Sequence, residues 1–498
     1  MNALTAHLPA LQVIVPMLMA PFVVLLRSRS LPWAAATATS LLAFAIAIQL
    51  ATMVMGGTPV SYAMGSWPAP YGIGLQVDAL SALVLLVVTG ASSVALVGGR
   101  ESLAAIISED REPYFFAAWL LALAGMAGIV VSADAFNIFV FMEISSLACY
   151  VLIAGGPDRR ALPATFKYLI IGTIGATFYL IGVGLIYMMT GTLNLADMEL
   201  RILEVADQKP ILAAAGFITV GLALKAAIFP LHVWLPNAYT YAPHMVTAFL
   251  AACATKVSLY VLLRFDFFVF QQNLAGHEFQ FAAYLMPLAI LGILVGSAVA
   301  MFERNIKRLL AFSSVAQIGY MMLGASMVTA TGLTAATLHM FNHALAKGGL
   351  FLAIAAIAVV AAGCRLGDIG GLARRMPWTF AALVVAGLSL IGVPGTAGFI
   401  SKWYLINAAL ELETGGVALV ALILVSSLMA VVYVWRIVEA AYFGEPGDAA
   451  NDKPTPAPLA LVVILWTVAV ANIAFGIAPE LPLSLSATAA DILLGHVR

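Results

Sequence analysis

The chain has 498 residues, of which 63% are apolar and only 9% are charged, and its net charge is −1. Soluble globular proteins carry roughly 25% charged residues, so this composition excludes an ordinary soluble domain. The near-neutral charge carries no indication of nucleic-acid or acidic partners. The three cysteines, Cys149, Cys253 and Cys364, are far apart in or beside apolar runs, without the spacing of a metal or iron–sulfur site.

Apolar runs long enough to cross a bilayer, about 20 residues each, recur along the whole chain. We predict an all-α integral membrane protein with about fourteen transmembrane helices. The predicted spans are 8–26, 32–54, 78–98, 113–131, 135–154, 161–189, 211–236, 244–270, 281–302, 305–326, 331–361, 376–410, 415–443 and 457–478. The first is expected to be a permanent helix and not a cleaved signal, because residues 1–7 are not basic and the run ends at Arg27 and Arg29.

The distribution of Lys and Arg predicts the orientation, because basic residues concentrate in cytoplasmic loops. With the N-terminus outside, the inner loops hold thirteen basic residues and the outer segments hold four. The inner set is Arg27, Arg29, Arg100, Arg111, Arg159, Arg160, Arg304, Lys307, Arg308, Arg365, Arg374, Arg375 and Lys453. The outer set is Arg201, Lys209, Arg264 and Arg498, so both termini are predicted to lie outside.

The loops are short and offer no site for chemistry outside the membrane. The longest are 55–77, rich in Gly and Pro, and 190–210, which could form a short surface helix. The sequence contains no nucleotide-binding loop, dinucleotide fingerprint or zinc motif, so we expect no cofactor and no metal.

Five ionisable residues fall inside predicted spans: Glu143, Lys225, Lys256, Lys347 and Lys402. Each costs about 2.5–3.5 kcal/mol near the bilayer centre, and such residues usually form proton relays or ion paths. The alternative for each is a buried ion pair that fixes helix packing, or a lysine that reaches an interface. One acid cannot neutralise four lysines, so some lysines must be neutral, hydrated or only transiently paired.

Burial disfavours a charged lysine and a nearby carboxylate favours it, so a lysine whose partner can leave is a proton switch. We hypothesise that Glu143 holds Lys225 protonated and that breaking this pair releases a proton toward Lys256. His339, His343 and Lys347 are spaced four apart, on one face of a helix, and form a candidate relay. Ser313, Ser314, Gln317 and Tyr320 could hold waters beside it, although such residues also join helices.

Two spans contain helix-breaking residues. Pro230 follows Lys225 in span seven, and residues 393–398, Val-Pro-Gly-Thr-Ala-Gly, precede Lys402 in span twelve. Interrupted helices in corresponding halves indicate the transport site of an inverted-repeat transporter. We therefore predict a three-helix region in 1–112, inverted five-helix repeats in 113–270 and 281–443, and a loop, last helix and tail in 444–498.

Several stretches resemble the proton-conducting subunits shared by respiratory complex I and the Mrp-type cation/proton antiporters. The stretches are ALKAAIFPLHVWLPNAYTYAPHMVTAFLAACATKVSLYVLLRF, FNIFVFMEISSLACYVL, RNIKRLLAFSSVAQIGYMMLG and LHMFNHALAKGGLFL. The resemblance covers about residues 110–440. The chain length is most similar to that of the D-type antiporter subunits.

The resemblance implies functional residues and partners. The glutamate of span five falls on Glu143, the lysines of spans seven and eight fall on Lys225 and Lys256, and the ionisable residue of span twelve falls on Lys402. His339 and His343 carry over with less force, and His244 is interpreted as a loop residue. The resemblance also implies neighbouring membrane subunits and a bacterial inner membrane.

The sequence thus favours an ion-transporting subunit, not an enzyme in itself, that moves protons in a multi-subunit Na⁺ or K⁺/proton antiporter. One alternative is a proton-pumping subunit of a complex-I-like NADH:quinone oxidoreductase or membrane-bound hydrogenase, whose residues would look the same. Others are a stand-alone solute transporter and a structural membrane scaffold. The sequence does not distinguish Na⁺ from K⁺.

Overall fold

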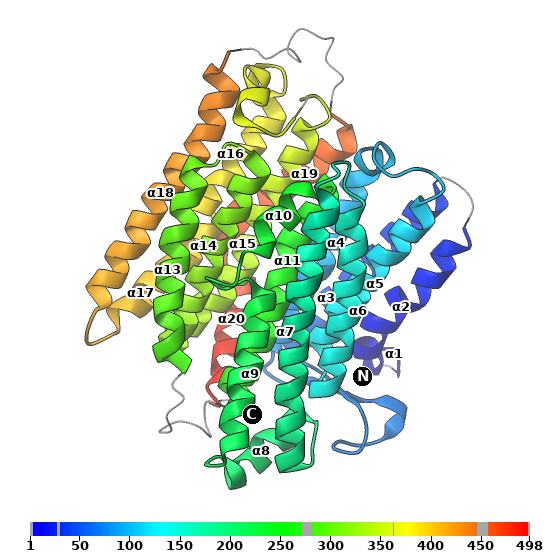
Figure 1. Cartoon of the computed structure of the whole chain (residues 1–498), viewed down its shortest axis with the longest axis vertical. Helices are drawn as coiled ribbons and strands as arrows, with labels where there is room; N and C mark the ends of the chain where they lie inside the picture. Colours follow the sequence, from blue (N-terminus) through cyan, green and yellow to red (C-terminus); the bar gives the residue numbers. More distant parts are fainter. Residues whose placement is uncertain (1–2, 27–29, 271–280, 362, 446–456, 497–498) are drawn as a thin grey trace.

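The computed structural model is a bundle of helices (Figure 1). It describes residues 3–26, 30–270, 281–361, 363–445 and 457–496. Arg27, Arg29, Lys453 and Arg498, which contribute to the predicted charge asymmetry, lie outside the described residues. The chain ends lie in the lower part of Figure 1, toward the end that carries α8.

Twelve helices in the described part of the chain are long and apolar enough to cross a membrane, and α2 and α16 are shorter apolar helices. The prediction of about fourteen spans is confirmed, because every predicted span corresponds to an observed helix or to a pair of helices. The helices of the first half are α1 Ala3–Ala6, α2 Leu8–Val24, α3 Leu31–Val54, α4 Ala79–Ala104, α5 Glu112–Val131, α6 Ala135–Ala154, α7 Ala161–Thr190, α8 Leu195–Val205, α9 Lys209–Ala226, α10 Trp234–Tyr241 and α11 His244–Leu263. Those of the second half are α13 Phe281–Phe302, α14 Ile306–Ser326, α15 Ala330–Ile357, α16 Pro377–Ile391, α17 Ala397–Leu410, α18 Gly416–Phe443, α19 Leu459–Ile477 and α20 Glu480–Leu493.

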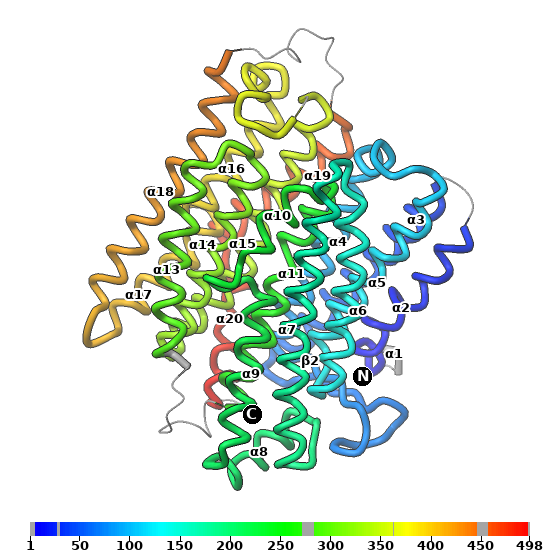
Figure 2. The backbone as a smooth tube through the Cα atoms, viewed as in Figure 1, coloured from blue at the N-terminus to red at the C-terminus, as the bar shows by residue number. Residues whose placement is uncertain are grey.

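Spans seven and twelve are both broken, as predicted. Helix α9 ends at Ala226, and Ala227 takes a left-handed conformation (φ 57°) before Pro230 and α10. Helix α16 ends at Ile391, and Gly392 is left-handed (φ 90°) before Pro394 and α17. The proline in each connection lacks the backbone N–H that a continuous helix needs. Figure 2 traces the chain from α9 in the lower part to α10 in the upper half.

The two longest loops contain secondary structure. Residues 195–205 form α8, as predicted, with the Asn194 side chain capping its first turn. Leu195, Met198 and Ile202 are the buried residues of this amphipathic helix. The loop 55–77, for which the sequence predicts no secondary structure, contains strands β1 Val60–Ala63 and β2 Gly74–Val77. They pair in antiparallel register, with Val60 opposite Val77.

Helix α15 is the centre of the second half of the molecule. It packs against α4, α11, α14, α16, α17, α19 and α20, and its residues from Gly332 to Ile357 are almost all buried. The interpretation of residues after 478 as a tail is wrong, because α20 packs along α15 and α4. The end of α19 abuts the break in span twelve, since a Cβ on Gly476 would lie 2.5 Å from the Gly395 oxygen.

Candidate functional site

Glu143 and Lys225 meet at the contact of α6 with the end of α9. The Lys225 Nζ lies 4.0 Å from the Glu143 Oε1 and donates a hydrogen bond of 2.7 Å to the Ser146 Oγ. The buried Glu143 Oε1 has no hydrogen-bond partner among the described residues. The predicted pair is therefore present as a loose contact, in which the serine and not the carboxylate binds the ammonium group directly.

The surroundings of Lys225 suit a group that gains and loses a proton. Lys225 lies in the last turn of α9, where the helix dipole favours a cation. Beside it is a cavity of about 30 Å³, lined in part by Ser145, Ser146 and Ser258. A polar cavity of this size can hold at least one water molecule.

Lys256 lies in the middle of α11 and is 1% exposed. Its Nζ donates to the Ala251 carbonyl, 2.5 Å away. It lies close enough to His339, His343 and Lys347 on α15 for their charges to interact. The structure thus brings Lys256 together with the candidate relay on α15.

The three α15 residues share one buried face, as their spacing predicts. The rings of His339 and His343 stack with 6.0 Å between their centroids. The Lys347 Nζ donates to the Leu310 carbonyl at 2.6 Å and also to the Ser313 Oγ. Both ring nitrogens of His343 lack a hydrogen-bond partner in the part of the chain that the structure describes.

Side chains of α14 contact α15 directly. The sequence analysis proposed only that these side chains hold water beside it. Gln317 Oε1 lies 2.9 Å from the His339 Nε2, and the Tyr320 ring packs edge-on against the same imidazole. Ser314 instead donates to the Leu310 carbonyl of its own helix. Of the four predicted side chains, three therefore contact the candidate relay.

Lys402 lies on α17 and reaches back to the end of α16. Its Nζ donates to the Ile391 carbonyl at 2.8 Å and to the Ser427 Oγ at 3.0 Å, and lies 4.9 Å above the centre of the Tyr320 ring. The neighbouring Ser401 Oγ is 2.8 Å from the His339 Nδ1. The break in span twelve thus exposes the carbonyl groups that bind Lys402.

The seven predicted residues form two groups. Glu143 and Lys225 form the first, and Lys256, His339, His343, Lys347 and Lys402 form the second. No hydrogen bond or ion pair joins Lys225 to Lys256 among the described residues. The small cavity beside Lys225 is also lined by Ala254 and Ser258, so it reaches α11, the helix that carries Lys256.

The sequence-based count of one intramembrane acid is wrong. Asp266 lies in η2 (Arg264–Phe270), the π-helical end of the eighth span, and is 1% exposed. Its Oδ1 accepts a hydrogen bond from Thr219, and its Oδ2 has no partner among the described residues. The sequence analysis assigned charged residues near the ends of predicted spans to the adjacent loops. It therefore did not identify this buried acid.

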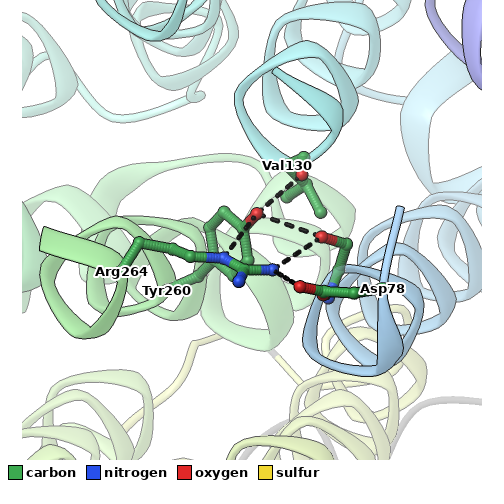
Figure 3. A network of polar contacts seen from close by, with 5 residues as sticks. Asp78, Val130, Tyr260 and Arg264 are labelled. Carbon is green, nitrogen blue, oxygen red and sulfur yellow. Dashed lines mark hydrogen bonds and ion pairs between the residues drawn. The ribbon is translucent and has the colours of Figure 1, made fainter. Parts of the chain in front are cut away.

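Arg264 is also not an outer-loop cation. It forms a buried ion pair with Asp78, the N-cap of α4, and lies against Tyr260, whose hydroxyl donates to the Val130 carbonyl at 2.8 Å (Figure 3). An aspartate directly before a helix is a recognisable capping signal, but nothing in the sequence indicates its partner.

Lys307, predicted in an inner loop, is buried in the first turn of α14. Its Nζ donates to the Ala242 carbonyl at the end of α10, 2.6 Å away. His244, interpreted as a loop residue, is the first residue of α11. Both assignments are wrong because the short connection between α10 and α11 is packed inside the bundle.

Comparison with known proteins gives consistent matches along the chain. The model of the NADH:quinone oxidoreductase/Mrp antiporter transmembrane family matches residues 132–430. The chain is 43% identical to the N subunit of NADH-quinone oxidoreductase from Desulforudis audaxviator over 460 residues, which cover 91% of this chain and 90% of that relative. It is 30% identical to the D subunit of a Na⁺/H⁺ antiporter from Alkalihalophilus pseudofirmus, with 90% and 89% covered.

Solved structures agree with the sequence relatives. A chain in the structure of the Mrp complex from Dietzia sp. DQ12-45-1b matches with a TM-score of 0.89 and 28% identity, covering 99% of this chain and 98% of that one. A chain of respiratory complex I from Thermus thermophilus matches with a TM-score of 0.71 and 26% identity, covering 96% and 98%. The resemblance inferred from the sequence is confirmed, and the chain belongs to the NADH:quinone oxidoreductase/Mrp antiporter transmembrane family.

Proposed function

We propose that this chain is the proton-translocating subunit of a multi-subunit monovalent cation/proton antiporter. The observation that carries the proposal is the series of buried or half-buried ionisable side chains from Glu143 on α6 to Lys402 on α17. The four lysines of this series donate their hydrogen bonds to neutral oxygen atoms. Ionisable residues inside a membrane are costly and usually serve transport.

In the proposed mechanism, Glu143 and Lys225 form the switch. When the carboxylate is close, it favours the charged lysine, and when the pair separates, burial favours release of the proton. The proton passes through water near Ser258 toward Lys256. His339, His343 and Lys347 relay it, and Lys402 is the terminal gate at the second break.

The relatives named as Na⁺/H⁺ antiporter D subunits and the match to an Mrp complex support the antiporter assignment. The second candidate is a proton-pumping subunit of a redox-driven complex. The 43% identical relative, named as the N subunit of NADH-quinone oxidoreductase, favours it. The two candidates share the same path for protons and differ in what drives it.

The proposal includes neighbouring subunits on two faces. On α6 and α7, large apolar side chains such as Leu147 and Phe166 are exposed, and on α17 and α18 the same is true of Trp403, Leu428 and Trp435. Glu143 and Lys402 lie on helices of these two faces. We infer that subunits placed against these faces would continue the series of charges.

We also propose two inverted five-helix units, 113–270 and 281–443, in a bacterial inner membrane with both termini outside. The matching breaks before α10 and α17 support the repeat.

The orientation is tested with Ser61→Cys in β1 and Arg159→Cys before α7, in a Cys364→Ser background. An impermeant thiol reagent added to intact cells should label only the first, and the reverse pattern would invert the topology.

The function is tested by expressing the whole neighbouring gene cluster and measuring cation/proton exchange in everted vesicles. Wild-type vesicles should exchange protons for Na⁺ or K⁺ without an electron donor, and Lys225→Ala should abolish exchange while the assembly remains intact. Glu143→Ala should also impair it. Wild-type vesicles that move protons only when an electron donor is supplied would establish the redox-driven candidate.

A further inference from the structure

Four arginines surround a pocket at the end of the bundle opposite to α8. The pocket has a volume of about 390 Å³, within the range of ligand sites. It lies where the loop before α7, the end of α10, the start of α14 and the segment before η3 (Leu366–Ile369) meet. Its lining residues are Arg160, Thr240, Tyr241, Glu303, Arg304, Asn305, Arg308 and Arg365.

The pocket has an excess of positive charge. Arg308 pairs with Glu303 at 3.1 Å, and Arg160 pairs with Asp158 at 2.5 Å. The hydrogen bond from Arg160 lowers the pKa of Asp158, so that carboxylate remains ionised. The guanidinium groups of Arg304 and Arg365 form no ion pair with other described residues, and the Asp368 carboxylate accepts a hydrogen bond from the Arg365 backbone N–H at 2.8 Å. The four arginines therefore outnumber the three nearby acids, Glu303, Asp158 and Asp368.

Backbone geometry adds to this positive potential. Asn305 caps the first turn of α14 and pairs in a β-bridge with Arg365. The positive end of the α14 dipole thus points toward the pocket. Guanidinium groups and helix N-termini together are the groups that proteins use to bind phosphate.

Exposed apolar side chains lie both beside the pocket and at the break in span seven. Leu162 is 61% exposed just after Arg160, and Phe302 is 80% exposed just before Glu303. Helix α10 has eight residues, so the break lies about 12 Å from the Tyr241 end of the pocket. At the break, Val233 is 62% exposed and the His232 ring packs between Phe229 and Phe312.

We propose that this pocket binds the phosphate of an anionic phospholipid, whose acyl chains cover the break between α9 and α10. The ligand needs a phosphate for the arginines and an apolar chain for Leu162, Phe302 and Val233. Basic pockets between helices on the cytoplasmic side bind anionic headgroups, and the orientation proposed above places this end on that side. A lipid here would contact the half-helix connection that follows Lys225.

The test uses the assembly purified in a neutral detergent and a phosphatidylglycerol that carries a diazirine on its acyl chain. After irradiation, mass spectrometry locates the labelled peptides. Labels are expected on residues 229–241 and 299–308. Excess phosphatidylglycerol should compete with the label, whereas phosphatidylcholine should not.

The double variant Arg304→Ala/Arg365→Ala should lower labelling by about tenfold, because it removes two charge-assisted contacts. The matched control is Arg159→Ala/Arg374→Ala, which removes two exposed arginines from the same end but outside the pocket. Thermal unfolding of both variants shows whether the fold is kept.

Three results would overturn the proposal. Equal labelling of the two double variants would show that the arginines do not hold the lipid. Competition by inorganic phosphate but not by phosphatidylglycerol would assign the pocket to a soluble phosphate. Absence of label from residues 229–241 and 299–308 of the wild type would show that no anionic lipid occupies this surface. Each readout is binding, so none depends on the proposed transport.

Discussion

At the scale of single residues, the buried lysines share one feature: neutral oxygen atoms accept their hydrogen bonds. Lys225 donates to a serine, Lys256 to a backbone carbonyl, and Lys347 and Lys402 to a carbonyl and a serine each. Removing a proton from Lys256, Lys347 or Lys402 leaves no carboxylate uncompensated, whereas opening a buried ion pair leaves a buried charge. This arrangement suits lysines that change protonation state.

A matched pair of serines on α14 tests this feature. Ser313→Ala removes an acceptor of Lys347, so it should slow exchange and lower the free energy of unfolding by about 1–3 kcal/mol. Ser314→Ala is the control, because its hydroxyl only bonds to its own helix. Vesicle exchange and thermal unfolding, followed with a thiol dye that reacts with the buried Cys149 and Cys253, measure both effects. Equal effects of the two substitutions would argue against the role of Ser313.

The Asp78–Arg264 pair has a different character, because it is a fixed ion pair. Asp78→Ala leaves the Arg264 charge buried without its partner and should cost about 3–5 kcal/mol of unfolding free energy. The double variant Asp78→Ala/Arg264→Met should recover part of this loss. The thermal unfolding midpoint of the purified assembly checks both, and a double variant less stable than the single one would contradict the account.

Sequence reasoning selected the candidate residues and the contact of Glu143 with Lys225, but not the oxygen atoms that bind the lysines. Glu143, Lys225 and Lys402 stand out because each is an isolated charge in an apolar run. Asp266 and Arg264 were missed because they lie near a predicted helix end, where charges are normally solvated. The separation between Lys225 and Lys256 depends on how α9 and α11 pack, which their sequences do not encode locally.

At the scale of elements, each break lies beside a buried lysine: Lys225 is in the last turn before the first break, and Lys402 is on the helix that follows the second. In span twelve the end of α16 binds Lys402, and the left-handed Gly392 makes the turn possible. The hydropathy pattern predicted the spans and their breaks well, since long apolar runs and Pro-Gly clusters are local signals. It missed α20, whose 14 residues are too few to span a membrane, and the β1–β2 hairpin in a Gly- and Pro-rich loop.

Glycine substitutions test the importance of the turn in span twelve. Gly392→Ala places a Cβ at positive φ and 2.7 Å from the Lys402 Cδ, so it should cost about 1–3 kcal/mol and impair exchange. Gly348→Ala on α15 meets no atom within 4 Å and should be neutral or slightly stabilising. Thermal unfolding and vesicle exchange are the measurements. Wild-type behaviour of Gly392→Ala would mean that the turn does not position Lys402.

At the scale of the whole molecule, the ionisable residues cross the bundle from α6 to α17 and pass through the central helix α15. The faces at both ends of this series carry exposed apolar side chains, as expected for surfaces that meet lipid or a neighbouring membrane subunit. Family membership and the general architecture could be predicted from the sequence, because the apolar runs and the family's motifs are both local patterns. What drives the proton movement could not be predicted from the sequence, because antiporter and redox-driven relatives share this architecture.

The most direct test of the central claim, that protons cross along these residues, is proton flux into proteoliposomes that contain the purified assembly. Lys225→Ala and Lys402→Ala change opposite ends of the series, and Lys167→Ala, an exposed lysine on α7, is the control. With assembly and thermal stability unchanged, the account predicts that both buried-lysine variants lose cation-driven or redox-driven proton flux while Lys167→Ala keeps it. Wild-type flux in Lys225→Ala or Lys402→Ala would contradict the account.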